Sequence, residues 1–269
     1  MNEPDGYVQN GGVRLAYWER GKGPETLLLI MGIVYRAAFF RQQFIDALAQ
    51  HFRVVLFDNR GTGYSTKPVE HITADLWASD AIAVLDALGI ERTSLLGYSM
   101  GGRVAQQLMV DHPERLERII LLSATVGGPE GVPPEDRALT SFVIEPGADP
   151  EAARRSALLS LCGPGLDERD PETVETFVEL GRTKRTPASV VQKQLMVANT
   201  NVCPRLSETR APCQIVHGNC DPLVPPQNAD ILKRCLPHAD LVKLDGYGHF
   251  LQWEAVDELT AIVLPFLRD

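Results

Sequence analysis

The feature that most constrains this chain is a serine placed between an expected strand and an expected helix. Residues 93–96 form a short β-branched and apolar run suited to a buried strand, and apolar residues after Ser99 recur at three-to-four spacing until about Pro113. Gly97 and Gly101 stand two positions before and two positions after the serine. A turn this tight brings its flanking positions against neighbouring backbone, where a β-carbon would collide. The pattern predicts that Ser99 projects from the sheet over the amino end of the helix.

Such a Gly-x-Ser-x-Gly turn can display a nucleophilic hydroxyl. At the amino end of a helix, the free N–H groups and the positive end of the helix dipole favour an oxyanion that develops during a reaction. A glycine-rich turn between a strand and a helix can also be only a packing device. The rest of the sequence has to decide between these two interpretations.

Length and composition narrow the class of protein. The 269 residues suffice for one large α/β domain or for a core domain with an insertion, and 44% hydrophobic residues can fill its core. The net charge of −9 and the lack of a basic stripe argue against a nucleic-acid partner. No apolar run is long enough to span a bilayer, and residues 1–12 lack the layout of a signal peptide. We therefore expect a cytoplasmic protein with no membrane partner, either a monomer or a homodimer.

The cysteines and histidines show no metal-binding spacing, and there is no His-Glu-x-x-His motif, so we expect neither a metal nor another cofactor. Five cysteines form an odd set without a Cys-x-x-Cys pair: Cys162, Cys203, Cys213, Cys220 and Cys235. This pattern predicts reduced thiols and not a disulfide framework.

Strands and helices are expected to alternate along most of the chain. Apolar runs predict strands at residues 13–18, 26–31, 53–57, 93–96, 118–122, 213–217 and 240–244. Amphipathic spacing predicts helices at residues 39–50, 73–88, 227–235 and 253–267, besides the helix that follows Ser99. This alternation indicates a parallel sheet covered by helices on both faces. In such sheets the ligand crevice lies beyond the carboxyl ends of the strands, which is where Ser99 falls.

The alternation stops at Gly127, where a stretch rich in glycine and proline begins. Four short helices are expected after it, each with a proline near its first turn, at residues 134–144, 150–161, 171–181 and 187–199. We interpret residues 127–204 as a helical lid inserted over the crevice. Residues 1–126 and 205–269 then form the core.

A serine hydroxyl needs a base to remove its proton, and the base needs an acceptor to orient it. His249 follows the last expected strand, in a loop that would lie at the same sheet edge as Ser99. Asp221 follows the preceding strand, whereas the loop after residues 118–122 offers no carboxylate. The remaining histidines are interpreted as structural: His51, His71, His112, His217 and His238.

Together these stretches make the chain resemble the serine hydrolases of the α/β-hydrolase fold, over nearly its whole length. The order Ser99, Asp221, His249 is the order of nucleophile, acid and histidine in that family. The matching stretches are residues 29–32, 58–65, 97–102, 217–225 and 248–250. The resemblance implies a mostly parallel, eight-stranded sheet with helices on both faces and a helical lid. Within the family the chain is similar to the carboxylesterase, enol-lactonase and methylesterase-like groups.

The resemblance also implies an oxyanion hole formed by the backbone N–H groups of Met100 and Ile33. Most relatives have His-Gly where this chain has Met31 and Gly32, a variant that resembles carboxylesterase-like and aclacinomycin methylesterase-like members. Because the hole uses backbone groups, the change should not abolish catalysis.

The identity of the nucleophile indicates the reaction. Related epoxide hydrolases and haloalkane dehalogenases have an aspartate at this turn, whereas Ser99 points to acyl transfer. We expect a small-molecule carboxylic ester or lactone as substrate. Other functions share the same triad: C–C bond hydrolysis, cofactor-free perhydrolysis, a methylesterase or cyclase step in natural-product biosynthesis, and ligand binding by a receptor-like member of the fold.

Several apolar side chains are candidates for substrate binding: Tyr35, Phe39, Tyr98, Phe142 and Met196. The same side chains would also suit a core between lid and sheet. The sequence leaves both interpretations open.

Overall fold

The computed structural model describes residues 3–67, 72–140, 147–197 and 202–269. One sheet of eight strands has the order β1-β2-β4-β3-β5-β6-β7-β8. Its strands are β1 Gly6–Asn10, β2 Val13–Arg20, β3 Thr26–Ile30, β4 Arg53–Phe57, β5 Thr93–Tyr98, β6 Leu116–Leu122, β7 Cys213–Gly218 and β8 Asp240–Leu244. β1 and β2 pair antiparallel with their neighbours, and the remaining pairs are parallel. This confirms the expected mostly parallel sheet.

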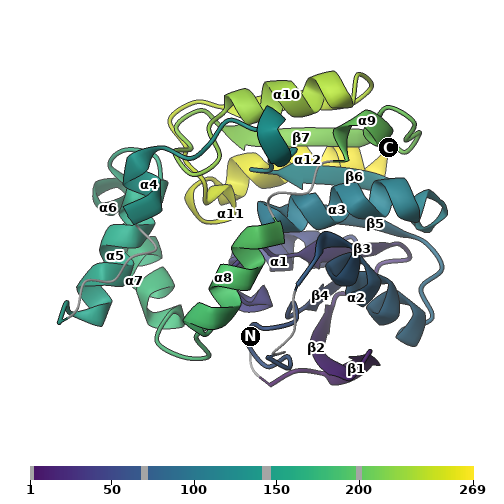
Figure 1. Cartoon of the computed structure of the whole chain (residues 1–269), viewed down its shortest axis with the longest axis horizontal. Helices are drawn as coiled ribbons and strands as arrows, with labels where there is room; N and C mark the ends of the chain where they lie inside the picture. Colours follow the sequence, from purple (N-terminus) through teal and green to yellow (C-terminus); the bar gives the residue numbers. More distant parts are fainter. Residues whose placement is uncertain (1–2, 68–71, 141–146, 198–201) are drawn as a thin grey trace.

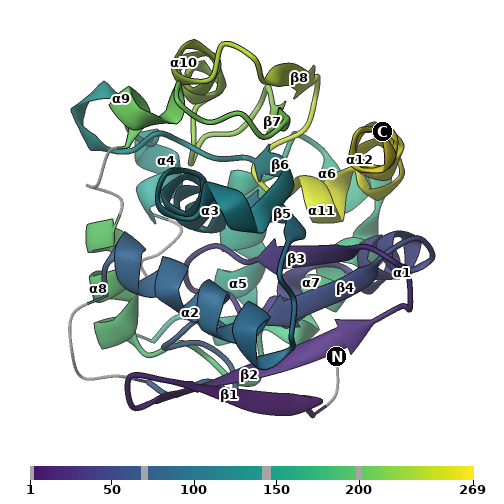
Figure 2. The ribbon, with the colours of Figure 1, turned by 90° about the vertical axis from the view of Figure 1, so that its right-hand side faces the viewer.

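Helices cover both faces of the sheet, as the sequence predicted. Figure 2 shows α2 (Ala74–Ala87) and α3 (Met100–Asp111) on one side of the strands, and α1 (Gln42–Ala49) and α12 (Val256–Arg268) on the other. Alternate residues of each central strand enter the two cores: in β3, Leu28 packs with the α2 and α3 side, and Leu27 with the α1 and α12 side. Near-complete burial of β3, β4 and β5 accounts for their continuous apolar sequences.

Between β6 and β7 the described residues form only helices and connecting turns. They are the short 3₁₀ turn Gly128–Glu130, α4 Asp136–Thr140, α5 Pro150–Leu161, α6 Leu166–Arg169, α7 Pro171–Leu180, α8 Ala188–Val197 and α9 Cys203–Leu206. Figure 1 shows α4 to α8 at the left of the molecule, beside α11 (Leu251–Glu254). Asp149 and Asp170 cap α5 and α7 through side-chain bonds to backbone N–H groups. We call the described residues between 127 and 204 the helical insertion.

The prediction that all five cysteines are reduced is wrong. Cys203 in α9 and Cys235, the last residue of α10 (Gln227–Cys235), form a disulfide with their Cα atoms 5.3 Å apart. Cys162, Cys213 and Cys220 are free. The pairing arises where the chain returns from the helical insertion and α9 packs against α10. Sequence spacing does not show such a contact, because disulfide geometry depends on the folded backbone.

None of the helices in the described ranges combines the length and the apolar character needed to cross a membrane.

Candidate active site

Ser99 occupies the sharp turn between β5 and α3. Its backbone has φ 54° and ψ −116°, a conformation that costs energy for a residue with a side chain and that recurs at functional sites. The Ser99 N–H bonds the Leu122 carbonyl at 2.8 Å. A β-carbon on Gly97 would lie 2.4 Å from the Gly101 oxygen, and one on Gly101 would lie 2.1 Å from the Ile30 oxygen. The flanking glycines are therefore required for the turn that presents the serine.

The structure brings the three expected triad residues into one hydrogen-bonded row. His249 Nε2 lies 3.1 Å from Ser99 Oγ, and His249 Nδ1 lies 2.7 Å from Asp221 Oδ2. Ser99 is 9% exposed, His249 2% and Asp221 1%, so the row is shielded from bulk water. This is the geometry in which a carboxylate orients an imidazole and the imidazole can take a proton from the serine.

Asp221 is held ionised by its surroundings. Its second oxygen, Oδ1, accepts hydrogen bonds from the N–H groups of Leu223 (2.9 Å) and Val224 (2.8 Å). Burial alone would raise the pKa of this carboxyl, but the charge of His249 and hydrogen bonds from His217 and His249 outweigh it and lower the pKa to about 2. The carboxylate can therefore stabilise a protonated His249.

His217, interpreted from the sequence as structural, also contacts the acid. Its Nε2 lies 2.7 Å from the Val224 carbonyl and 3.4 Å from Asp221 Oδ2, and the side chain is fully buried. Both neighbours are acceptors, so this nitrogen carries the hydrogen. The four-residue spacing between His217 and Asp221 was the feature of the sequence that could have indicated this contact.

The loop after β3 carries Ile33, one of the two residues expected at an oxyanion hole. A β-carbon on Gly32 would lie 3.1 Å from Ser99 Cβ, so the chain passes directly beside the serine. Ile33 follows Gly32, and Met100 is the first residue of α3. The next amide, that of Val34, already donates to Gln194 Oε1 at 2.9 Å. Gly32, which precedes Ile33, therefore passes beside Ser99, while the Val34 amide has another partner.

The helical insertion holds this loop in place. Val34 has φ 70°, which is unusual for a β-branched residue, and its carbonyl accepts a 2.5 Å bond from the Thr186 hydroxyl. Arg36 donates to the carbonyls of Leu180 (3.1 Å) and Thr183 (2.8 Å). Gln194 is fully buried, and sequence reasoning missed it because a glutamine in a short amphipathic helix gives no signal.

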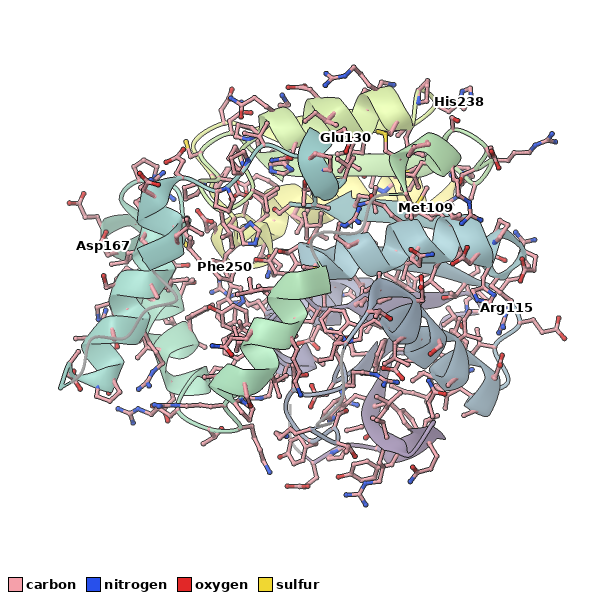
Figure 3. All side chains as sticks on the ribbon, in the orientation of Figure 1. Met109, Arg115, Glu130, Asp167, His238 and Phe250 are labelled. Atoms are coloured by element: carbon pink, nitrogen blue, oxygen red, sulfur yellow. A yellow bond between two sulfur atoms is a disulfide. The ribbon has the colours of Figure 1, made fainter. Side chains whose placement is uncertain are left out.

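An aromatic cluster lies between the insertion and the sheet. Ring centroids are 4.5 Å apart for Tyr35 and Phe39, 5.1 Å for Phe39 and Phe177, and 5.1 Å for Phe177 and Phe250. Figure 3 labels Phe250 where the insertion meets the core.

Three of the five candidates for substrate binding belong to the interior around this cluster. Tyr35 and Phe39 are members of it, and the Tyr98 ring lies 5.2 Å from the His249 ring. Phe142 and the side chain of Met196 fall outside the described residues.

No group of three or more His, Cys, Asp or Glu side chains in the described ranges is arranged to hold a metal ion.

Comparison with known proteins places this geometry in a family. A family model described as alpha/beta hydrolase fold matches residues 25–256. A 2-hydroxy-6-oxononadienedioate/2-hydroxy-6-oxononatrienedioate hydrolase of Burkholderia vietnamiensis is 32% identical, over 95% of this chain and 91% of that protein. The human serine hydrolase BPHL is 28% identical, over 97% of this chain and 85% of its own length.

Solved structures of other proteins have a similar fold. Est816, described as an N-acyl homoserine lactone degrading enzyme, superimposes with a TM-score of 0.81 at 29% identity, over 97% of this chain and 99% of that one. An enol-lactonase from Burkholderia xenovorans has the same TM-score at 23% identity, over 98% and 100% of the two chains, and at that identity it shows the fold alone. The chain belongs to the α/β-hydrolase fold family.

Proposed function

We propose that this protein is a serine hydrolase that cleaves a small carboxylic ester or lactone through an acyl-enzyme on Ser99. The observation that carries the proposal is the buried row in which His249 Nε2 lies 3.1 Å from Ser99 Oγ and Nδ1 lies 2.7 Å from Asp221. Est816, described as a lactone-degrading enzyme, supports the substrate class.

The reaction follows from the positions of these groups. Ser99 Oγ attacks the carbonyl carbon while His249 Nε2 takes the hydroxyl proton, and Asp221 stabilises the resulting imidazolium. The carbonyl oxygen becomes an oxyanion that the N–H groups of Met100 and Ile33 stabilise. The carbonyl then re-forms, and the leaving alkoxide departs with the proton from His249. A water molecule repeats the sequence on the acyl-enzyme, which releases the acid and restores the serine.

The helical insertion acts in this proposal as a lid. Its contacts with Val34 and Arg36 set the loop that carries Ile33, and its Phe177 completes the aromatic cluster beside the site. Apolar walls of this kind favour an apolar acyl group over a charged one.

C–C bond hydrolysis is the second candidate, and the comparison at 32% identity favours it. The compounds named for that relative carry a ketone, a hydroxyl and two carboxylates, and contain neither an ester nor a lactone. A hydrolase acting on such a compound has to break a carbon–carbon bond next to the ketone. The same serine, histidine and aspartate could serve both reactions.

Intact-protein mass after exposure to a small fluorophosphonate tests the proposal. One adduct on the wild type and none on Ser99→Ala is the expected result, because the activated serine displaces fluoride from phosphorus. Absence of an adduct on the wild type would contradict it and favour a ligand-binding protein.

A substrate panel then separates the candidates. Values of kcat/KM are compared for an N-acyl homoserine lactone, a short aryl ester and a 2-hydroxy-6-oxo-dienedioate. Hydrolysis of the lactone or ester at least about tenfold faster than the dienedioate is expected for the first proposal. The reverse order would establish the second.

A further inference from the structure

The loop that carries His249 is held by a carboxylate that the triad does not include. Glu254, the last residue of α11, accepts a hydrogen bond from the Gly248 N–H at 3.1 Å through Oε2 and from the Phe250 N–H at 3.1 Å through Oε1. Its two oxygens therefore bind the amides on either side of His249. Two such bonds fix the backbone that aims the imidazole.

The same carboxylate reaches the helical insertion. Glu254 Oε2 also accepts from the Gly163 N–H at 2.6 Å, and the Cys162 thiol donates to Glu254. The His249 N–H itself donates to the Leu161 carbonyl at 2.8 Å. The turn at residues 161–163, which begins at the last residue of α5, is thus bonded directly to the histidine loop and indirectly through Glu254.

Two glycines make this contact possible. A β-carbon on Gly163 would lie 2.0 Å from the Gly246 oxygen, and one on Gly248 would lie 2.3 Å from the Leu161 oxygen. Neither position can carry a larger side chain without moving backbone. The two segments therefore approach as closely as bare backbone allows.

The charges around Glu254 agree with an acceptor role. Burial raises the pKa of Glu254 above its ordinary value, and the three backbone N–H groups and the Cys162 thiol offset part of this rise by stabilising the ionised form. Burial and the neighbouring Glu254 raise the pKa of the Cys162 thiol well above its ordinary value. The thiol therefore keeps its proton at neutral pH and remains a donor.

We infer that Glu254 is a positioning residue that clamps the His249 loop to the turn at residues 161–163, so that the docked insertion holds the imidazole against Ser99. The inference rests on the proposed function, since it takes His249 as the base. It assigns to the insertion a second task besides covering the site. When the turn undocks, the His249 N–H loses its Leu161 acceptor and Glu254 loses its bond to Gly163.

Glu254→Gln tests the clamp, because it keeps the shape of the side chain and replaces one acceptor oxygen by an NH₂ group. The new side chain can then no longer accept hydrogen bonds from all three amides, those of Gly248, Phe250 and Gly163. The rate constant for Ser99 phosphonylation by the fluorophosphonate should fall about 10- to 100-fold, as expected for a misplaced base. For the preferred substrate, kcat should fall with KM within about twofold.

Glu258→Gln is the matched control. Glu258 lies on the next helix and accepts a 2.8 Å bond from the Tyr247 hydroxyl. The substitution therefore neutralises a neighbouring carboxylate without changing the acceptor of the amides around His249. Its phosphonylation rate should equal that of the wild type. A Glu254→Gln rate within twofold of the control would overturn the inference.

A proton spectrum separates positioning from general destabilisation. In the folded wild type, the His249 Nδ1 proton in its bond to Asp221 should give a low-field resonance that disappears in His249→Asn. Glu254→Gln should broaden or shift this resonance while the rest of the spectrum stays folded. An unchanged resonance would argue against the clamp. If the wild type shows the resonance but forms no adduct, the proposed function fails and the clamp can still be tested.

Gly163→Ala tests the partnership with the insertion. Its β-carbon would push the turn away from Gly246, so phosphonylation should slow as in Glu254→Gln. The double variant should be no slower than the worse single variant, because both remove the same contact. Additive losses would show that the two residues act separately.

Discussion

Asp221 is the residue on which the contacts of the site converge. One oxygen faces both His249 and His217, and the other accepts two backbone N–H groups. The carboxylate therefore cannot rotate without losing bonds. Because it accepts from His249 Nδ1, it fixes the tautomer in which Nε2 is free to take the Ser99 proton.

Asp221→Asn should separate this orienting role from binding. The amide offers a donor where His249 needs an acceptor, so the imidazole adopts the wrong tautomer. We expect kcat to fall by about 10⁴-fold with KM little changed. Steady-state kinetics on the best substrate measure this, with Cys220→Ser as the control at the neighbouring, partly exposed position. A loss below tenfold would remove Asp221 from the triad.

The low pKa of Asp221 also predicts how stability depends on pH. The pKa of this carboxyl is about 2 in the folded protein, against an ordinary value of 3.8 that applies to the unfolded chain. A depressed pKa contributes stability that is complete above about pH 4 and is lost as the pH falls toward 2. The contribution is about 2 kcal/mol.

Urea unfolding at pH 5, 4, 3 and 2.5 checks this dependence. The wild type should lose stability more steeply than Asp221→Asn over the lower part of the range. Parallel curves for the two proteins would contradict the assignment.

At the scale of elements, α8 and the loop after β3 act as a pair. Gln194→Leu would leave the half-buried Val34 N–H without its acceptor, which costs about 1 kcal/mol of unfolding free energy. Since Val34 adjoins Ile33, the variant should also lower kcat. Gln192→Leu is the matched control, because Gln192 is exposed on the same helix. Equal melting temperatures and rates for the two variants would show that the contact is dispensable.

Local signals explain which elements could be predicted. α5 and α10 begin and end where proline and amphipathic spacing placed them, and β4 coincides with its apolar run. β1 was missed because it is a polar edge strand with one buried residue, Val8. The last expected helix, residues 253–267, is two helices, because the backbone at Ala255 leaves the helical conformation.

Some residues of the site could likewise be predicted from the sequence, and others could not. Ser99, Asp221 and His249 could be placed because each follows a strand, and the ends of parallel strands meet at one edge. Gln194 and Glu254 could not, because their partners are backbone groups far away in sequence or in an irregular loop. No residue pattern marks a side chain that accepts hydrogen bonds from backbone groups of a distant or irregular segment.

At the scale of the molecule, the helical insertion is fastened to the core at two further places besides its bonds to the loop after β3. One is the turn at residues 161–163 against the histidine loop, and the other is the disulfide between Cys203 and Cys235. The disulfide lies where α9 leads back toward β7, so it restrains the end of the insertion rather than the site itself.

Reduction of this disulfide should therefore lower the free energy of unfolding and leave the reactivity of Ser99 unchanged. Opening a cross-link between residues separated by 32 positions releases chain entropy in the unfolded state, which corresponds to about 3–4 kcal/mol. Urea unfolding with and without dithiothreitol should show this difference for the wild type and none for the double variant Cys203→Ser/Cys235→Ser. Phosphonylation of Ser99 at 25 °C should proceed at the same rate in both forms, because the triad and the clamp at Glu254 do not involve these sulfurs. If the reduced protein is as stable as the oxidised one, the disulfide adds nothing to the stability of the fold. If the reduced protein stays folded but its Ser99 is phosphonylated more slowly, the end of the insertion controls the site.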